Sequence, residues 1–468
     1  MAKDVALIGC GPVGALLANL LGQEGLAVDV YERDREIYAL PRAVAFDGEV
    51  MRIFQAAGLA EAIKAITRPG TEGTHFVNSE GRTLLRRDLK PGPGPHGWAD
   101  SWYFHQPDLE RTLRAGLERF PNVAVHLGHE VASLDALDHR YVIGCDGARS
   151  LVRPAIGSTR LDLGLHQPWL VVDLLCDERS PRFQALATYT IQLCDPARPM
   201  TLVNVGPAGP GLWRRRWEIM LMPGDQPERL TDPDIFWPMM ARWLGPEDAK
   251  LERAAVYTFH SVVQQGWRKG RLLLAGDSCH QTPPFLGQGM CSGLRDAANL
   301  SWKLAAVLRG AAPDSLLDTY ESERRPHVAA FIEMAVELGG VLQETDPARA
   351  AARDSRFAES LQTYVLPQPS LGAGCRLDAP PPVGRPFPQP RLADGRLMDE
   401  AIGARFAVVG EAGLLEGLRT HAVVLPDVGT EWLADHGAHA AILRPDRYVF
   451  ALAHDRAEIE SALAGLPF

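Results

Sequence analysis

The sequence predicts a mixed α/β protein with three structural parts, and three observations lead to this prediction. First, the chain has 468 residues, and because a domain usually holds roughly 100 to 200 residues, it must fill more than one core. Second, its N-terminal segment reads as strand, Gly-rich turn, helix and strand, which is typical of a doubly wound α/β domain. Third, alternating apolar runs in the middle of the chain and short apolar runs near its end indicate an antiparallel sheet and a further small α/β domain.

Composition and charge exclude several classes of protein. The chain has 58 acidic residues against 48 Lys and Arg, a net charge of −10, which is the wrong sign for binding phosphate backbones, so we expect no nucleic acid partner. The seven cysteines lack CxxC or metal-ligand spacing, which predicts reduced thiols, a cytoplasmic protein and no metal site. The uncharged run Val5–Leu21 is interrupted by glycines and Pro12, which argues against a membrane span.

The first element is typical of a dinucleotide-binding unit. Asp4–Ile8 predicts a buried strand, Ala15–Gly22 a helix and Ala27–Tyr31 a second strand. Between the first strand and the helix lies a GxGxxG turn made of Gly9, Cys10, Gly11, Pro12, Val13 and Gly14. In such a turn the glycines allow a tight bend, close approach of a pyrophosphate and packing of helix on strand.

Charged residues follow at the spacing that a bound nucleotide requires. Glu32 lies 18 residues past Gly14, close to the position of an acid that accepts from ribose hydroxyls. Arg33 and Arg42 add positive charge where adenosine or pyrophosphate would lie. The turn and the acid together predict dinucleotide binding.

Two more signatures occur further along the chain. Arg140–Cys145 predicts an apolar strand that runs into Asp146, with Arg153 close behind. Arg271–Ala275 predicts another strand, and the loop that follows it contains Gly276, Asp277, Pro283, Pro284, Gly287 and Gly289. From Ser292 onward, apolar residues at spacings of three and four predict an amphipathic helix. A helix N-terminus after a Gly-rich loop stabilises a group that becomes negative, such as a reduced flavin ring.

Together these motifs resemble the three fingerprints of the single-component FAD-dependent aromatic hydroxylases of the para-hydroxybenzoate hydroxylase type. The fingerprints occur in the same order: GxGxxG with Glu32, CDGARS at Cys145–Ser150, and AGDSCHQTPPFLGQGM at Ala275–Met290. Four further segments are similar to the 3-(3-hydroxyphenyl)propionate hydroxylase branch: Arg214–Asp225, Leu286–Ala305, Leu316–His327 and Arg444–Ala451. The resemblance covers essentially the whole chain.

The resemblance implies an oxidoreductase with FAD as cofactor. It would use NADH or NADPH and O₂ to hydroxylate a phenolic substrate through a C4a-hydroperoxyflavin, most simply a 3-(3-hydroxyphenyl)propionate-like acid in aromatic catabolism. The residues that would hold FAD are Gly9, Gly11, Pro12, Val13, Gly14, Glu32, Arg33, Arg42, Gln106, Val131, Asp146, Arg153, Gly276, Asp277, Pro284, Gly287, Gly289, Met290 and Cys291. Among these, Asp146 and Arg153 would also serve the nicotinamide, and the carbonyl group of Pro284 would face the substrate.

The resemblance also implies how the chain is divided. A discontinuous, Rossmann-like FAD domain would comprise residues 1–165 and 258–345, and an antiparallel sheet domain for the substrate would comprise 166–257. After a linker at 346–374, residues 375–468 would form a thioredoxin-like domain without the CxxC motif. We expect an interaction surface there, for example in a homodimer, with structural packing as the alternative.

The chemistry requires a group that handles the phenol proton, because a phenolate is attacked faster than a phenol. Candidates are His280, His105, Tyr103 and Tyr257, beside the Pro284 carbonyl. A substrate carboxylate would require an arginine, and the candidates Arg214, Arg215 and Arg216 lie on one predicted strand. Since strand side chains alternate, Arg214 and Arg216 share a face and Arg215 opposes them.

Two alternatives stay open on the sequence. One keeps the fold but changes the substrate to a larger polycyclic, quinoline or antibiotic aromatic. The other is a flavin-binding scaffold or regulator without turnover, against which the intact Asp146, Asp277 and Pro284 argue.

Overall fold

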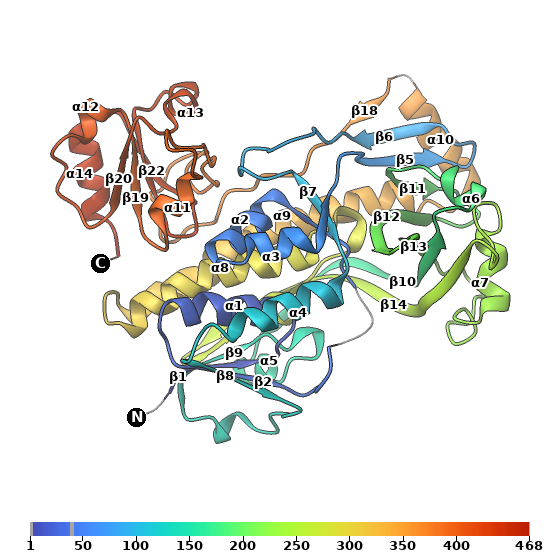
Figure 1. Cartoon of the computed structure of the whole chain (residues 1–468), viewed down its shortest axis with the longest axis horizontal. Helices are drawn as coiled ribbons and strands as arrows, with labels where there is room; N and C mark the ends of the chain where they lie inside the picture. The colour runs from blue at the N-terminus through green and yellow to red at the C-terminus, as the bar shows by residue number, and fades with distance from the viewer. Residues whose placement is uncertain (1–2, 38–41, 359, 468) are drawn as a thin grey trace.

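The structure is a computed structural model that describes residues 3–37, 42–358 and 360–467. Figure 1 shows an elongated molecule in which the C-terminal part of the chain forms a separate lobe at one end and a large sheet lies at the other. Within the described residues no helix is both long and apolar enough to cross a membrane. The mixed α/β class predicted from the sequence is confirmed.

The first sheet has six strands among the described residues, in the order β15-β16-β9-β1-β2-β8. They are β1 (Lys3–Ile8), β2 (Val28–Glu32), β8 (Val123–Leu127), β9 (His139–Gly144), β15 (Arg268–Lys269) and β16 (Leu272–Leu274). All neighbours pair in parallel except β15 and β16. The strands predicted before each of the three signatures are therefore confirmed, and they are neighbours in one sheet although β16 is far from β1 in sequence.

Helices from three parts of the chain cover one side of this sheet (Figure 1). They are α1 (Pro12–Gln23), α4 (Gln106–Leu117) and α8 (Gly289–Leu308), and α1 packs against both of the others. Apolar side chains of the sheet and of these helices form one continuous core. The amphipathic helix predicted from Ser292 is confirmed, and it begins three residues earlier, at Gly289.

The second sheet has nine strands in the described residues, in the order β17-β14-β10-β13-β12-β11-β5-β6-β18. Its strands are β5 (Thr74–Asn78), β6 (Thr83–Arg87), β10 (Thr159–Asp177), β11 (Thr190–Cys194), β12 (Met200–Gly209), β13 (Leu212–Met220), β14 (Ala249–Gln265), β17 (His280–Gln281) and β18 (Gln362–Thr363). Most pairs are antiparallel as predicted, while β5 with β11 and β6 with β18 are parallel. Since four of these strands come from outside residues 166–257, the sheet extends beyond the predicted substrate domain, whose limits stay a prediction.

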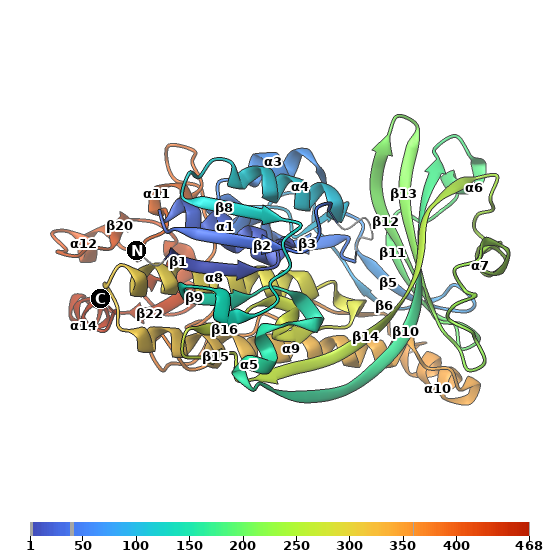
Figure 2. The same cartoon turned by 90° about the horizontal axis from the view of Figure 1, so that it is seen from below.

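The two faces of this sheet differ. Leu170, Val172 and Trp217 pack against Phe236 and Met240 of α7 (Pro233–Met240) on the face that we call the outer face. The opposite, inner face carries Asp173 and Arg216, because strand side chains alternate. Figure 2 shows α7 and α6 (Pro181–Gln184) on the side of the sheet that is turned away from the six-stranded sheet. The inner face is therefore the one toward the nucleotide-binding part.

The C-terminal lobe has a four-stranded sheet in the order β20-β19-β21-β22. Its strands are β19 (Ala407–Gly410), β20 (Val423–Pro426), β21 (Ala440–Leu443) and β22 (Val449–Ala453). The first two pair in parallel and the others antiparallel. The helices are α11 (Met398–Ile402), α12 (Ala412–Leu415), α13 (Thr430–Asp435) and α14 (Arg456–Ala464). The small α/β domain predicted near the end of the chain is therefore present, and the thioredoxin-like assignment stays a prediction.

The remaining elements join these parts. A three-stranded sheet consists of β3 (Ala45–Asp47), β7 (Ser101–Phe104) and β4 (Thr67–Pro69). The other helices are α2 (Gly48–Ala56), α3 (Ala60–Ala65), α5 (Val152–Ile156), α9 (Thr319–Leu342) and α10 (Pro347–Ala358). On α2, Arg52 binds Asp399 of the C-terminal lobe with a buried Nε–Oδ2 distance of 2.6 Å.

Candidate cofactor and substrate site

The Gly-rich turn between β1 and α1 has no room for side chains at its first and third glycines. A Cβ atom on Gly9 would lie 2.5 Å from the carbonyl oxygen of Cys145, and one on Gly14 would lie 2.0 Å from the carbonyl oxygen of Gly9. A Cβ atom on Gly11 would meet nothing within 4 Å. The first and third glycines are thus required for packing, whereas the second leaves backbone open to a ligand, as a pyrophosphate requires.

The other two signatures lie beside this turn. Gly9 lies against the residue that follows β9, since a Cβ atom on Gly9 would be 2.5 Å from the carbonyl oxygen of Cys145. A Cβ atom on Gly293 of α8 would lie 2.7 Å from Val13 Cγ2 and 3.0 Å from Gly276 Cα. The structure therefore brings the three signatures together, and the N-termini of α1 and α8 begin side by side without a side-chain cap. The residues present fit a dinucleotide with a flavin ring.

Polar side chains border the same region. Glu32 Oε2 accepts a hydrogen bond of 2.8 Å from the Cys10 amide. Gln106 Oε1 accepts from the amides of Arg42 and Ala43 at 2.7 and 2.9 Å. The Arg42 guanidinium and the Asp277 carboxylate are 3.6 Å apart, and both are largely exposed. Glu32, Gln106, Arg42 and Asp277, four of the residues predicted to contact the cofactor, thus lie around the first and third signatures.

Arg33 and Val131 lie at the edge of this group. The Arg33 side chain is 66% exposed and pairs only with neighbouring Asp34 among the described residues, and Val131 packs partly buried on the main core. Contacts of either residue with adenosine stay predictions.

Arg153 links the second signature to the third, whereas Asp146 bonds within the segment of the second. Asp146 Oδ2 accepts a 2.6 Å hydrogen bond from the Leu151 amide, and burial raises the pKa of this carboxyl group. Arg153 donates to the carbonyl groups of Ala148 and Ser278 at 2.7 and 3.3 Å. These contacts show both side chains bracing the loops, while a contact with nicotinamide stays a prediction.

Buried charged side chains anchor the loop before α8. Arg295 donates to Gln288 Oε1 at 2.9 Å and to Glu49 Oε2 at 2.6 Å. Glu49 Oε1 accepts in turn from the Tyr448 hydroxyl of the C-terminal lobe at 2.8 Å. Because Gln288 lies between Gly287 and Gly289, this chain of contacts fixes the loop from which Met290 and Cys291 follow. Sequence reasoning missed it, since its members are far apart in the chain.

Two of the predicted proton-handling residues, His280 and His105, lie beside carboxylates. His280 is 1% exposed, and its Nε2 atom lies 2.7 Å from Asp296 Oδ2 in the core. Its role in handling the phenol proton stays a prediction. His105 directly precedes α4, and its Nδ1 atom lies 3.0 Å from Asp108 Oδ2; its role in proton handling stays a prediction.

Two tyrosines lie at the inner face. Tyr103 clusters with Val44, Ala45, Val203 and Val205, and burial raises the pKa of its hydroxyl group. The hydroxyl group of Tyr257 accepts a 2.9 Å hydrogen bond from Arg253. Tyr103 and Tyr257 therefore stay candidates for handling the phenol proton. Pro284 begins the short helical turn that precedes Gly287.

The arginines predicted to bind a substrate carboxylate are already paired or face elsewhere. Arg216 makes a two-bond contact with Asp173 at 2.7 and 3.0 Å, and Arg214 does the same with Glu252 at 2.6 Å. Both arginines lie on the inner face, where each is already paired with a carboxylate, and a contact of either with a substrate stays a prediction.

Asp173 also binds Arg253 at 2.6 Å, so one carboxylate holds two inner-face arginines. Sequence reasoning missed Asp173, Arg253 and the buried Glu218. A signal was present: a charged residue inside the apolar run WLVVDLLC marks a side chain that needs a partner.

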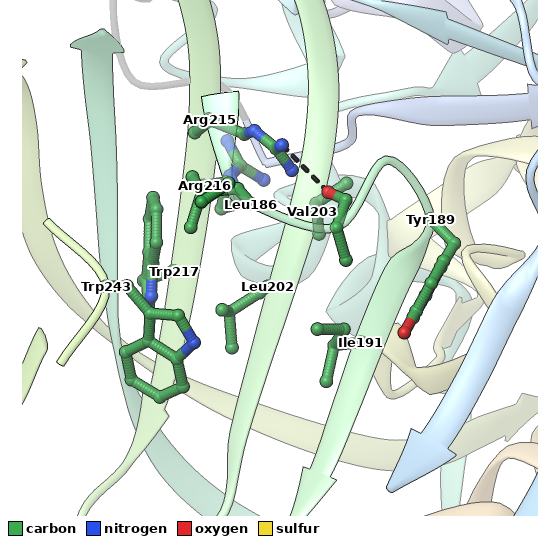
Figure 3. Close-up of a pocket in the computed structure, with 11 residues that line it drawn as sticks. Leu186, Tyr189, Ile191, Leu202, Val203, Arg215, Arg216, Trp217 and Trp243 are labelled. Carbon is green, nitrogen blue, oxygen red and sulfur yellow. Dashed lines mark hydrogen bonds between the residues drawn. The ribbon is translucent and has the colours of Figure 1, made fainter. Parts of the chain in front are cut away.

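Arg215 points to the outer face of the large sheet, whereas Arg214 and Arg216 point to the inner face. It stacks over Phe183 of α6 at 5.6 Å, and Figure 3 shows it above a pocket lined by Trp217 and Trp243. Arg215 is therefore separated from the inner face by the thickness of the sheet.

Comparison with known proteins agrees with this geometry. The family described as FAD binding domain matches residues 2–139 and 135–335. A "Probable NADH-specific resorcinol 4-hydroxylase" of Rhodococcus jostii (strain RHA1) is 40% identical over 520 residues, spanning 99% of this chain and 94% of that protein. A "3-(3-hydroxy-phenyl)propionate/3-hydroxycinnamic acid hydroxylase" of Escherichia coli (strain SMS-3-5 / SECEC) is 32% identical over 522 residues, spanning 96% of this chain and 92% of that protein.

A solved structure shows the same fold over the whole chain. The flavin-dependent monooxygenase PieE, in complex with FAD and substrate, superposes with a TM-score of 0.81 at 20% identity, covering 99% of this chain and 98% of that one. The chain therefore belongs to the FAD binding domain family and, within it, to the FAD-dependent aromatic hydroxylases.

Proposed function

We propose that this enzyme uses FAD, NADH and O₂ to hydroxylate a small phenol that carries a second hydroxyl group in the meta position, as resorcinol does. The pairing of charges on the inner face carries the proposal. Asp173 binds both Arg216 and Arg253, and Glu218 lies 3.7 Å from Arg216, so the face offers polar contacts without an uncompensated cation. The resorcinol hydroxylase among the relatives, NADH-specific by its name, supports the same substrate and reductant.

The residues that would hold FAD are those around the three signatures. Gly11 and the N-terminus of α1 would accept the pyrophosphate, Glu32 the ribose, and Asp277 with Gln106 the ribityl chain, while backbone at Gly289, Met290 and Cys291 would meet the pyrimidine ring. A bound FAD would supply the chemistry of accepting hydride from the nicotinamide and of reacting with O₂. The sheet would exclude water, which otherwise wastes the reduced cofactor.

Tyr257 is the residue we propose to handle the phenol proton. Its hydroxyl group lies on the inner face and is bonded to Arg253, whose Nε binds Asp173. Because the Arg253 guanidinium donates to the Tyr257 oxygen and fixes its position, this arrangement suits a hydroxyl group that exchanges a proton with the substrate oxygen. Tyr103, which bonds to the Thr190 hydroxyl group at 3.0 Å, would shape the pocket rather than move a proton.

A phenolic acid of the 3-(3-hydroxyphenyl)propionate type is the second candidate, and one observation favours it. Arg253 Nη2 is buried and has no hydrogen-bond partner within the described residues. A guanidinium donor forms its strongest hydrogen bonds with a carboxylate, which such an acid would supply. The Escherichia coli relative carries such a substrate in its name.

Turnover with matched substrates separates these candidates. We expect the purified, FAD-loaded enzyme to oxidise NADH faster with resorcinol than with 3-(3-hydroxyphenyl)propionate, by about tenfold in kcat/KM or more. Oxygen uptake and the hydroxylated product, measured by an electrode and by mass spectrometry, should match the NADH consumed. Coupled turnover with the acid but not with resorcinol would contradict the first choice and support the second. NADH oxidation without product for either phenol would contradict both.

The Tyr257→Phe variant tests the proton relay. We expect kcat to fall by about 10²-fold at neutral pH, because the phenol loses its acceptor. The loss should shrink as pH rises toward about 10, where a simple phenol ionises in water. Tyr189→Phe, which changes a ring stacked on His75 at 4.0 Å outside the inner face, is the control. A Tyr257→Phe enzyme with normal kcat at neutral pH would remove Tyr257 from this role.

We also propose a cytoplasmic location and a homodimer, as expected from the sequence. A cytoplasmic location is supported by seven cysteines without paired spacing, and cell fractionation checks it. A homodimer is expected from the extra C-terminal lobe, and light scattering of the holoenzyme checks it.

A further inference from the structure

The outer face of the large sheet has a cavity outside the site described above. It has a volume of about 140 Å³ and lies between β11, β12 and β13 and the segment after α6. Its walls are apolar and aromatic, and they include Leu186, Ile191, Leu202 and Trp243. A cavity of roughly 150 Å³ accommodates a benzene ring. The space therefore matches one six-membered ring rather than a polycyclic molecule.

Two buried hydrogen-bond donors in this wall have no acceptor. Arg215 is 5% exposed and Trp217 is 1% exposed. Arg215 Nε and Trp217 Nε1 make no hydrogen bond within the part of the chain that the structure describes. Within the described residues, Arg215 donates a hydrogen bond from Nη2 to the carbonyl group of Ala187 at 2.8 Å. An unmatched buried donor costs free energy, so two in one cavity indicate an acceptor that comes from outside the chain.

Arg215 also lacks a counter-ion. Among the described residues no carboxylate lies within ion-pair distance of it, and the residues that line the cavity include no Asp or Glu. Its neighbours in the strand, by contrast, are each paired: Arg214 with Glu252 and Arg216 with Asp173. Burial without a partner lowers the pKa of the Arg215 guanidinium to about 10. A buried cation of this kind is stabilised best by an anion that enters the cavity.

We propose that this cavity binds a monocyclic aromatic carboxylate of about the size of benzoate. The carboxylate accepts from Arg215 and from the indole N–H of Trp217, and the ring packs against the apolar wall. Arginine suits this role because its planar fork matches a carboxylate. The site is separate from the inner face, since Arg215 and Arg216 are consecutive residues of β13 and point to opposite faces. The proposal holds whichever phenol the enzyme hydroxylates.

Calorimetric titration of the FAD-loaded enzyme with benzoate tests the proposal. We expect saturable binding to the wild type and a loss of affinity of about 10-fold to 100-fold in Arg215→Met, which keeps the length of the side chain but removes its charge and donors. Benzyl alcohol, a neutral ring of similar size, should bind the two proteins alike. Arg229→Met, which changes an exposed arginine, is the matched control and should bind benzoate as the wild type does.

Two further measurements keep the result interpretable. Arg215→Met should melt at or above the wild-type temperature, because it removes an uncompensated buried charge. Ile191→Phe keeps Arg215 but fills the cavity, and it should also lose benzoate. Benzoate at this site should leave the visible spectrum of the flavin unchanged. The proposal is overturned if millimolar benzoate gives no heat of binding, or if binding persists in both variants and perturbs the flavin, which would place it on the inner face.

Discussion

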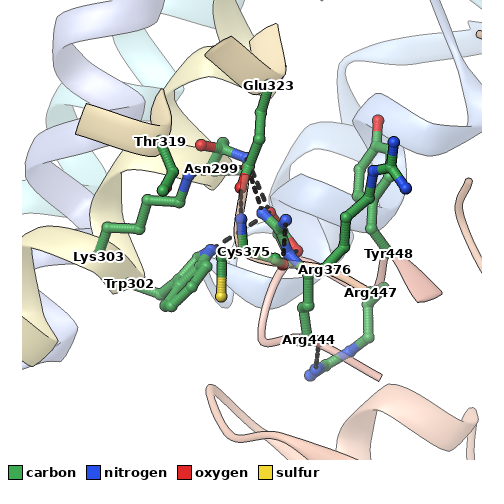
Figure 4. A network of polar contacts seen from close by, with 12 residues as sticks. Asn299, Trp302, Lys303, Thr319, Glu323, Cys375, Arg376, Arg444, Arg447 and Tyr448 are labelled. Carbon is green, nitrogen blue, oxygen red and sulfur yellow. Dashed lines mark hydrogen bonds and ion pairs between the residues drawn. The ribbon is translucent and has the colours of Figure 1, made fainter. Parts of the chain in front are cut away.

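Replacing Glu323 with glutamine is expected to lower the free energy of unfolding by about 3 to 5 kcal/mol, because it removes the charge at the centre of a fully buried network. The Glu323 side chain is 0% exposed. Its Oε2 atom accepts from Lys303 at 2.7 Å and from Arg444 at 2.8 Å, and Oε1 accepts from the amide of Cys375 at 2.6 Å. Figure 4 shows these groups converging from α8, α9 and the C-terminal lobe.

The size of this effect follows from what the substitution leaves behind. Glutamine has the same shape but no charge, so Lys303 would remain buried without its carboxylate; Arg444 would keep Asp446 at 2.7 Å. The cations hold the pKa of Glu323 well below its usual range, so the pair is charged at neutral pH. An isolated buried ammonium group either loses its proton or draws in water, and both outcomes loosen the contact between the C-terminal lobe and α8.

Urea unfolding followed by circular dichroism measures the loss. Glu333→Gln, on the exposed side of the same helix α9, is the matched control and is expected to change stability by less than about 0.5 kcal/mol. If Glu323→Gln is as stable as the control, the network does not hold the lobe in place, and the C-terminal lobe must be anchored by other contacts such as Arg52 with Asp399.

The second large effect, a loss of FAD binding, is expected when Gly11 or Gly14 in the turn between β1 and α1 is replaced, for a different reason at each. Gly11→Ala should fold like the wild type without cofactor, because its new Cβ atom meets no protein atom within 4 Å. Its affinity for FAD should nevertheless fall by about tenfold or more, equivalent to about 1.4 kcal/mol, because the methyl group occupies the space that the pyrophosphate needs.

Gly14→Ala should fail for another reason. Its Cβ atom would lie 2.0 Å from the carbonyl oxygen of Gly9, a backbone atom that can move only if the turn between β1 and α1 opens. We expect this variant to lose FAD and also to melt at a lower temperature as apoprotein. Flavin absorbance after gel filtration and thermal melts of the apoproteins measure both quantities. Equal apoprotein melting for the two variants would contradict the distinct roles assigned to these glycines.

Much of the fold could be read from the sequence where the signal is local. The strand, turn and helix at residues 4 to 22 are fixed by glycine spacing and by an apolar run. The large sheet was predicted in the same way from alternating apolar runs, and its strand β10 begins at Thr159, ten residues before the apolar run WLVVDLLC. The pairings of β5 with β11 and of β6 with β18 could not be read, because pairing between distant segments leaves no local pattern.

The candidate site shows the same division. The sequence alone determined the cofactor, since motif spacing records where backbone must approach a phosphate, and it determined the hydroxylase family through three motifs in order. Only the tertiary structure decided which charged side chains are buried, which partners they have and to which face of the sheet they point. It buried His280 beside Asp296, paired Arg216 with Asp173, and turned Arg215 alone to the outer face. The physical reason is that the free energy of a charged side chain depends on its burial and on partners from other segments. Neither can be read from the residues next to it in the sequence.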